Sequence, residues 1–177
     1  LGPRKRRCID ELGMGTNAKL LLQFRRHLAH YDRFNGEFYD EQVDTWDSSI
    51  AEPGRPGILT VYSGGSYGAA QRGHGPHGPA PRSRVAAALT KVSHAVPGLA
   101  AGFDGNAWLD HWASDPWAHG SYAAFEPGQY TRYWGFVGRP EGRLLFGGEH
   151  TALAAQGFFE GAVASGERCA GEVAALT

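Results

Sequence analysis

The end of the chain carries the residue types best suited to hold a large, negatively charged ligand. A short apolar run at residues 144–147 leads into Gly148 and Glu149, and Gly157 precedes a stretch with helical character. The first N–H groups of a helix have no intrahelical partner and lie at the positive end of its dipole, so they suit a phosphate or an electron-rich ring carbonyl. These residues predict a site where the backbone approaches an anionic ligand closely.

Small residues recur every four positions along that helix, which places them on narrow faces without bulk. An interior glycine costs a helix about 1 kcal/mol relative to alanine, so the pattern indicates a packing requirement. Such a face suits close packing against a cofactor or strand, and it equally suits a tight helix pair without a ligand. The two adjacent faces are formed by Gly157, Gly161, Ser165 and Cys169, and by Ala162, Gly166 and Ala170.

Two glycine clusters match the dinucleotide-binding fingerprint in their letters but not in their context. The first, at residues 73–78, contains Pro76 and has neither a strand before it nor a helix opening after it. The second, at residues 13–18, follows a predicted helix and precedes a predicted strand, which reverses the required order. We therefore expect no strand–turn–helix unit in this chain that holds a pyrophosphate.

The helices and strands that must position these residues can be predicted from the periodicity of apolar residues and from the glycines and prolines that interrupt it. Helices are predicted at residues 4–12, 84–95 and 158–176, and strands at residues 18–24, 57–63, 107–112 and 144–147. Residues 25–44 show no clean period, and residues 71–83 and 115–128 are expected to be loops. The mixture of strands and helices indicates an α/β or α+β fold rather than a helix bundle.

Composition and charge narrow the function classes. With 177 residues, 42% of them hydrophobic, the chain is long enough to bury a core as one domain or as pieces of two. A net charge of −1 argues against nucleic acid as the main partner, and the basic run at residues 3–7 is expected to be a solvated helix face or chain start. No apolar run is long enough to span a bilayer, so no membrane partner is expected.

Cysteines, histidines and carboxylates offer no recognisable metal or acid–base site. The two cysteines lie far apart without metal-ligand spacing, which fits a reducing compartment and leads us to expect a cytoplasmic location. His74 and His77 have His-x-x-His spacing, but their loop is rich in glycine and proline, so we expect them to be solvent-exposed. Asp47, Asp110 and Asp115 form no evident acid–base pair. No metal is expected.

Several segments, taken in order, resemble the C-terminal part of flavin-containing amine oxidases of the monoamine and polyamine oxidase group. Residues 46–49 and 57–65 match less closely than the others, and residues 65–83 have no clear counterpart. The resemblance rests on a glycine turn before a strand with one lysine (residues 13–20), a Trp-rich segment ending in Gly-Ser-Tyr (residues 112–122), the Gly-Gly-Glu-His-Thr turn (residues 147–151) and the glycine-rich helix start (residues 157–166).

The resemblance implies a two-domain, FAD-dependent fold of mixed α/β type, of which this chain is the C-terminal portion. Residues 1–140 would form the C-terminal part of a mixed-sheet substrate-binding domain. Residues 141–177 would form the returning strand and helix of a Rossmann-like FAD domain. The N-terminal FAD-binding segment would then be a required partner.

The resemblance also implies catalytic roles for Lys19, Tyr122 and Phe158. Lys19 matches a lysine that reaches flavin N5 through a water molecule. A lone amine on a buried strand is costly unless it is paired or its pKa is lowered, although an edge-strand lysine could instead extend to solvent. Tyr122 and Phe158 match two aromatic residues, tyrosines in many relatives, that flank the substrate amine and exclude water. Ordinary core packing is the alternative for both rings.

For the cofactor, the resemblance implies FAD. Glu149 would lie near its ribityl and pyrophosphate groups, and the amides at the helix start near the pyrimidine end of the flavin. Ser121 stands where covalently linked relatives have a cysteine, which predicts noncovalent binding. The lack of an acid–base pair agrees with flavin chemistry, in which the cofactor accepts the hydride. The implied cofactor-binding residues are Gly148, Glu149, Gly157, Phe158 and Phe159.

The expected reaction is oxidation of an amine to an imine, which hydrolyses to a carbonyl compound while oxygen is reduced to hydrogen peroxide. One alternative is an enzyme similar to L-amino-acid oxidases, which would need a cation for the substrate carboxylate; Arg132, Arg139 and Arg143 are candidates. Another is a catalytically inactive fragment that acts as an interaction module.

Overall fold

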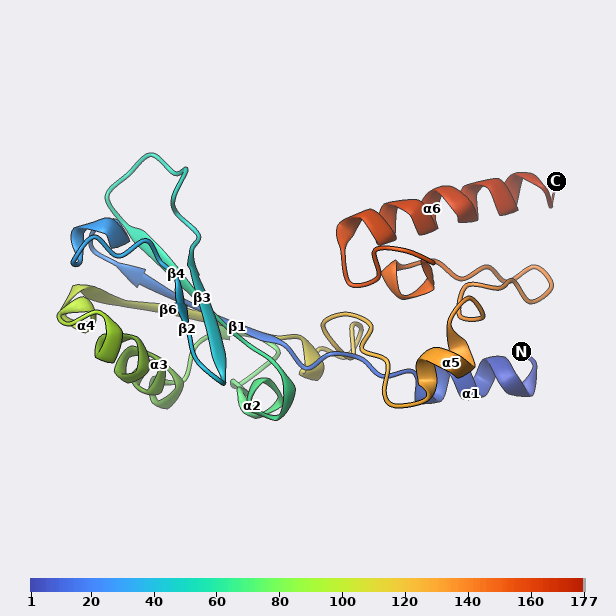
Figure 1. The fold of residues 1–177 in the computed structure, drawn as a ribbon, viewed down its shortest axis with the longest axis horizontal. Coiled ribbons are helices and arrows are strands. Elements are labelled where there is room, and N and C mark those ends of the chain that lie inside the picture. The colour runs from blue at the N-terminus through green and yellow to red at the C-terminus, as the bar shows by residue number, and fades with distance from the viewer. Residues whose placement is uncertain (177) are drawn as a thin grey trace. The chain divides into compact units, whose positions relative to one another are not determined.

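The computed structural model describes residues 1–176 and divides the chain into two compact units (Figure 1). The sheet unit is formed by Thr16–Ser121, and the terminal unit by Leu1–Gly15 together with Tyr122–Thr177. Each unit has its own cluster of buried apolar side chains. The predicted domain boundary at residue 140 refers to a complete two-domain enzyme and stays a prediction.

The sheet unit is built on six strands in the order β2-β3-β4-β1-β6-β5. The central strand β1 pairs with β4 on one side and β6 on the other, so that Leu20 faces both Val61 and Leu109. The predicted strands β1 and β4 are confirmed at both ends, and β6 begins at Phe103 rather than at residue 107. The strands are β1 (Ala18–Phe24), β2 (Phe38–Tyr39), β3 (Val43–Asp47), β4 (Gly57–Ser63), β5 (His77–Pro79) and β6 (Phe103–His111).

The sheet is antiparallel in every strand pair of residues 1–176, so the prediction of a mixed sheet is wrong for this chain. The connection from β5 to β6 shows the physical reason. It runs through α3 (Arg82–Ala95) and α4 (Leu99–Gly102) and returns to the end of the sheet that it left. A parallel pair would instead need a crossover to the opposite end. The coarser prediction of a mixed α/β fold is confirmed.

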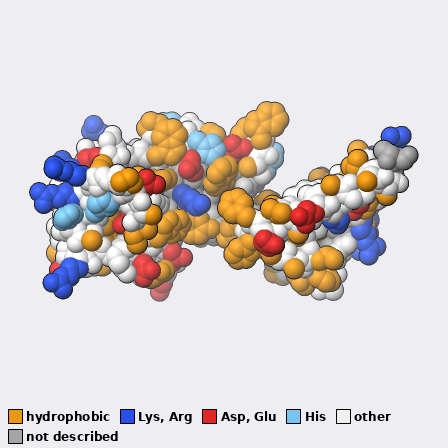
Figure 2. Space-filling model, turned by 90° about the horizontal axis from the view of Figure 1, so that it is seen from above, with side chains coloured by type: hydrophobic (Ala, Val, Ile, Leu, Met, Phe, Trp, Pro, Cys, Tyr) orange, Lys and Arg blue, Asp and Glu red, His pale blue; other side chains and the backbone are white. Residues whose placement is uncertain are grey.

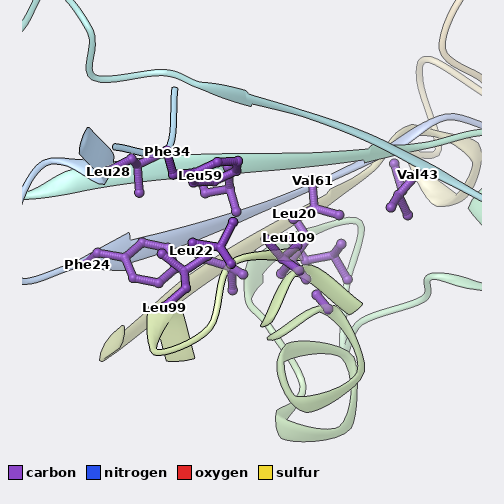
Figure 3. Close-up of a cluster of buried hydrophobic side chains, with 14 residues drawn as sticks. Leu20, Leu22, Phe24, Leu28, Phe34, Val43, Leu59, Val61, Leu99 and Leu109 are labelled. Carbon is purple, nitrogen blue, oxygen red and sulfur yellow. The ribbon is translucent and has the colours of Figure 1, made fainter. Parts of the chain in front are cut away.

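One face of the sheet is covered and the other is open. Ala18, Leu20, Leu22 and Phe24 alternate along β1 and are buried in a cluster of 14 side chains that includes residues of α3 and α4 (Figure 3). Successive side chains of a strand point to opposite faces, so the intervening residues of β1 lie on the uncovered face. The central strand therefore presents its polar side chains opposite the core.

Two regions without predicted elements contain short ones. Residues 71–83 were expected to be a loop, but they include β5 and the start of α3. Pro79 is tolerated because β5 is the edge strand, where a missing N–H breaks no ladder. Residues 25–44 contain the 3₁₀ turn η1 (Leu28–His30), β2 and the start of β3. Elements of two or three residues are too short to produce a readable period.

The terminal unit contains α1 (Pro3–Glu11), α5 (Gln129–Tyr133), the 3₁₀ turn η3 (Glu149–Thr151) and α6 (Phe159–Ala174). The predicted strand at residues 144–147 is wrong, because only an isolated bridge between Glu141 and Leu144 forms there within residues 1–176. A strand exists only where a partner strand accepts its hydrogen bonds. The Phe146 carbonyl instead accepts a hydrogen bond from Arg168 Nη2 on α6, at 2.7 Å. No helix of the described chain is long and apolar enough to cross a membrane.

Lys5 is a buried polar anchor of the terminal unit. The expectation of a solvated face at residues 3–7 is wrong for Lys5 alone, because the other four residues of the run are exposed. Its side chain is 1% exposed, and Nζ donates to the carbonyls of Phe136, Val137 and Arg139 at 3.1, 2.7 and 2.9 Å. The rings of Phe136 and Phe146 lie 4.7 and 4.2 Å from the ammonium. Burial lowers the pKa of Lys5, and the three carbonyls offset the loss of water.

Replacing Lys5→Met is expected to destabilise the chain by about 2–4 kcal/mol, because the three carbonyls that Lys5 binds lose a charged donor in hydrogen bonds that are partly or fully buried. Urea denaturation followed by far-UV circular dichroism measures the change. Arg7→Met is the matched control in the same helix, because Arg7 is exposed and its ion pair with Glu11 is long, at 3.7 Å. Equal effects of the two substitutions would contradict the anchoring role of Lys5.

Candidate functional site

Lys19 lies on the open face of the sheet unit, on its central strand. Its register partners are Tyr62 on β4 and Asp110 on β6, and Nζ is 5.9 Å from the centroid of the Tyr62 ring. The side chain is exposed, so the burial that would make an unpaired amine costly is absent within this chain. Because β1 is central, Lys19 is not an edge-strand lysine either. Lys19 therefore has an exposed side chain whose backbone position is fixed by strand pairing on both sides.

An apolar hollow of about 410 Å³ opens on the same face, two positions along β1 from Lys19. None of the residues that line it carries a charge. A ligand seated in this hollow would place an uncharged body beside the lysine amine. The lining residues are Leu21, Gln23, Ile58, Pro79, Gly105, Asn106, Ala107 and Trp108.

Tyr122, Gly157 and Phe158 come together in the terminal unit. The Tyr122 ring lies against Gly157, with Cδ2 3.7 Å from the place that a Cβ would occupy. Gly157 has φ +83°, a conformation that favours glycine, and so turns the chain sharply into α6. Phe158 and Phe159 follow it with 70% and 93% of their surface exposed, and such large apolar side chains on the surface are visible in Figure 2. Both rings are free to contact another group.

Glu149 joins the segment that follows Tyr122 to the segment that leads into α6. Its Oε1 accepts the Ala123 N–H at 2.8 Å, and its Oε2 accepts the Gly157 N–H at 2.6 Å. The carboxylate therefore fixes the segment after Tyr122 against the start of α6, and both of its oxygens are used. Its proximity to the ribityl and pyrophosphate groups of FAD stays a prediction.

Glu149→Gln is expected to lower the free energy of unfolding by about 1–2 kcal/mol, because the amide keeps one acceptor oxygen and turns an NH₂ group toward the other N–H. Hydrogen exchange at Ala123 and Gly157, together with urea denaturation, measures the change. Glu167→Gln is the control, since Glu167 is an exposed carboxylate of α6. Unchanged amide protection at Ala123 and Gly157 would show that Glu149 does not hold them.

The first small-residue face of α6 is used in packing within the terminal unit. A Cβ at Gly161 would collide with the Ala155 carbonyl oxygen, and the Ser165 hydroxyl accepts the Gly148 N–H at 2.9 Å. Gly148 itself has φ +122°, and a Cβ there would collide with the ring of His150. Close packing without a ligand therefore accounts for this face. The second face, formed by Ala162, Gly166 and Ala170, is exposed.

The polar cluster around His77 could not be found from the sequence. The expectation of a solvent-exposed loop residue is wrong for His77, which is only partly exposed and lies on β5, whereas His74 is exposed as expected. His77 Nδ1 lies 2.8 Å from Asp110 Oδ1, and Nε2 lies 3.2 Å from Asp115 Oδ2. The partners are 33 and 38 residues away along the chain, so no local spacing could indicate them. Among residues 1–176, no group of three or more histidine, cysteine or acidic side chains is placed to hold a metal ion.

The fold and site define an α/β protein with an antiparallel sheet whose open face presents a lysine. The family model described as flavin containing amine oxidoreductase matches residues 1–174. The chain belongs to this family, which confirms the resemblance.

Relatives and solved structures match only in part. Amine oxidase [flavin-containing] B of Cavia porcellus is 44% identical over 64 residues, which is 36% of this chain and 12% of that protein. A putative L-amino-acid oxidase, YobN, of Bacillus subtilis (strain 168) is 42% identical over 62 residues, 35% of this chain and 13% of that protein. The chain thus aligns with about an eighth of the length of these relatives.

Two solved structures share the fold over nearly the whole chain. Wild-type putrescine oxidase bound to putrescine superposes with a TM-score of 0.83 and 21% identity, covering 99% of this chain and 38% of that one. Cyclohexylamine oxidase from Brevibacterium oxydans IH-35A gives a TM-score of 0.82 and 21% identity, covering 98% and 38%. The chain therefore has the fold of a little over a third of each enzyme.

Proposed function

We propose that this chain completes the flavin and substrate pocket of an FAD-dependent amine oxidase. The position of Lys19 carries the proposal. Its ammonium stands on the uncovered face of the central strand beside an apolar hollow, and it forms no ion pair with any residue of the described chain. A lysine so placed is available to a ligand on that face rather than engaged in holding the fold.

The start of α6 fits the anionic and carbonyl groups of FAD. No side chain of residues 1–176 caps this helix, which begins at Phe159, whereas the N–H groups of Gly157 and Phe158 just before it are bonded to Glu149 Oε2 and the Ala155 carbonyl. The exposed second small-residue face of α6 lets another part of a complete enzyme approach closely. FAD, when bound, supplies the acceptor for a hydride from the α-carbon of the amine and passes the electrons to oxygen, which forms hydrogen peroxide. The residues that would hold it are Gly148, Glu149, Gly157, Phe158 and Phe159.

The chain's own residues would orient the substrate amine, exchange a proton near it and exclude bulk water. Lys19 would hold a water molecule and exchange a proton with it. Tyr122 and Phe158 would flank the amine with apolar surfaces. The uncharged hollow beside Lys19 would take the body of the substrate. The imine product would then hydrolyse to a carbonyl compound.

Purified alone, the 177-residue chain is expected to retain no FAD, because neither glycine cluster has the strand–turn–helix order that cradles a pyrophosphate. Mixed with a polypeptide that supplies the N-terminal FAD-binding segment, it is expected to retain about one FAD, which the absorbance spectrum measures. Acid precipitation should release all of the FAD, because Ser121 offers no thiol for a covalent link. Stoichiometric FAD on the isolated chain would overturn the proposal that this chain is half of the pocket. A chain that never acquires FAD would favour an interaction module.

In the reconstituted enzyme, Lys19→Met is expected to lower kcat by about tenfold or more, because the proton exchange at the lysine amine is lost. Peroxide formation measures kcat, and absorbance confirms unchanged FAD content. Lys91→Met is the control, since Lys91 lies on α3 and pairs with Asp40 at 2.7 Å. An unchanged kcat in Lys19→Met would remove Lys19 from the mechanism.

The similarity to YobN favours amino-acid oxidation as a second candidate, which needs a cation for the substrate carboxylate. Two of the three candidate arginines already bind other groups of the chain. Arg132 pairs with Glu11 at 3.0 Å, and Arg139 Nε donates to the Gly135 carbonyl. Only the exposed Arg143 remains of the three. The same peroxide measurement, made with monoamines, polyamines and amino acids, separates the candidates.

A further inference from the structure

The imidazole of His77 lies between two carboxylates of the sheet unit. Nδ1 is 2.8 Å from Asp110 Oδ1 on β6, and Nε2 is 3.2 Å from Asp115 Oδ2 in the segment after the 3₁₀ turn η2 (Trp112–Ser114). All three side chains are partly buried. A neutral imidazole has one N–H, so only the imidazolium can donate to both carboxylates at once. Without the second proton, a ring nitrogen lone pair would face a carboxylate oxygen.

Each neighbour of His77 is held by further contacts. Asp110 Oδ1 also accepts the indole N–H of Trp108 at 3.0 Å. Asp115 Oδ1 accepts the backbone N–H groups of Trp117 and Ala118 at 2.8 and 2.7 Å. The Trp112 ring lies edge-on to the imidazole, with centroids 4.7 Å apart. His77 is therefore the link between the edge strand β5 and residues 112–118.

The same cluster lies in strand register with Lys19. Asp110 is the register partner of His77 on one side and of Lys19 on the other, so the three side chains form a row across β5, β6 and β1 on the open face. Side chains directly opposite on neighbouring strands have Cβ atoms about 4.5–5.5 Å apart. Residues 112–118 also lead along the chain to Ser121.

We propose that His77 is a positioning residue whose imidazolium holds Asp110 beside Lys19 and fastens residues 112–118 to the sheet. One proton on the imidazole then sets the net charge of the His77, Asp110 and Asp115 cluster and the place of the segment. The effect on amine oxidation rests on the proposed function, whereas the fastening of the segment does not.

The charges around the imidazole support this role. Asp110 faces it from β6 and Asp115 from the segment after η2, while Lys19 on β1 lies beyond Asp110. The hydrogen bond with Asp110, followed by that with Asp115, raises the pKa of His77 against the opposing effect of burial. The backbone amides of Ala118 and Trp117 lower the pKa of Asp115, which keeps it charged. The contribution of the cluster to stability is thus fully present below about pH 6.5, the ordinary histidine value, and is lost as pH rises through the raised pKa.

The test follows the histidine ring signals by NMR and the hydrogen exchange of the Trp117 and Ala118 amides across this pH range, in the 177-residue chain. In the unsubstituted chain, His77 should titrate above the ordinary histidine value. Amide protection, corrected for intrinsic exchange, should fall at least threefold above its pKa. His77→Gln should show low protection at every pH. His74→Gln, an exposed histidine of the same loop, should behave as the unsubstituted chain.

A His77 pKa at or below the ordinary value would overturn the proposal, as would the same pH-dependent loss of protection in His77→Gln. If His77→Gln does not fold, Asp115→Asn serves instead. It keeps the Asp110 contact and should both lower the His77 pKa and remove the pH dependence of protection. Persistence of that dependence in Asp115→Asn would also overturn it. No flavin or amine enters these measurements, so their failure leaves the proposed oxidation standing, and a failed oxidation leaves them unaffected.

Discussion

The pairing of β1 with β4 on one side and β6 on the other fixes the geometry on which the candidate site depends. The register that buries Leu20 and Leu22 necessarily places Lys19 and Leu21 on the open face. A slip of one residue would exchange the two sets and move an ammonium into the apolar core, where it has no partner. The apolar side chains opposite Lys19 therefore hold it in place.

The terminal unit depends on a different kind of interaction, because its buried apolar cluster is small and centres on Cys8, Tyr133 and Val137. Charged side chains directed at the backbone supplement it. Lys5 donates to three carbonyls, and Glu149 accepts two amides. Such contacts both stabilise loops and fix their positions. If a loop moved away, the charged group would lose its backbone partners without gaining full contact with water, which is unfavourable. The start of α6 and the segment after Tyr122 are positioned in this way.

Elements with a strong period could be read from the sequence. The strands β1 and β4 were predicted at both ends, and α3 and α6 at the correct places, because their apolar residues repeat over seven positions or more. The two- and three-residue strands β2 and β5 were not, because each forms only by pairing with a longer neighbour. Residues 144–147 fail for the opposite reason: their apolar run predicts a strand, but no strand forms because no partner strand of the described chain pairs with it.

By itself, the sequence determined that Lys19 interrupts an apolar strand, that glycines crowd the start of α6, and that the motifs stand in the order of the flavin-containing amine oxidase family. Residue type and spacing suffice for such features because they are local. Only the tertiary structure decided that Lys5 is buried, that Glu149 joins two segments, and that His77 lies between Asp110 and Asp115. Each of these depends on residues distant in sequence meeting in space. The strength of a charge–charge or charge–dipole contact is set by distance and burial, which no local spacing contains.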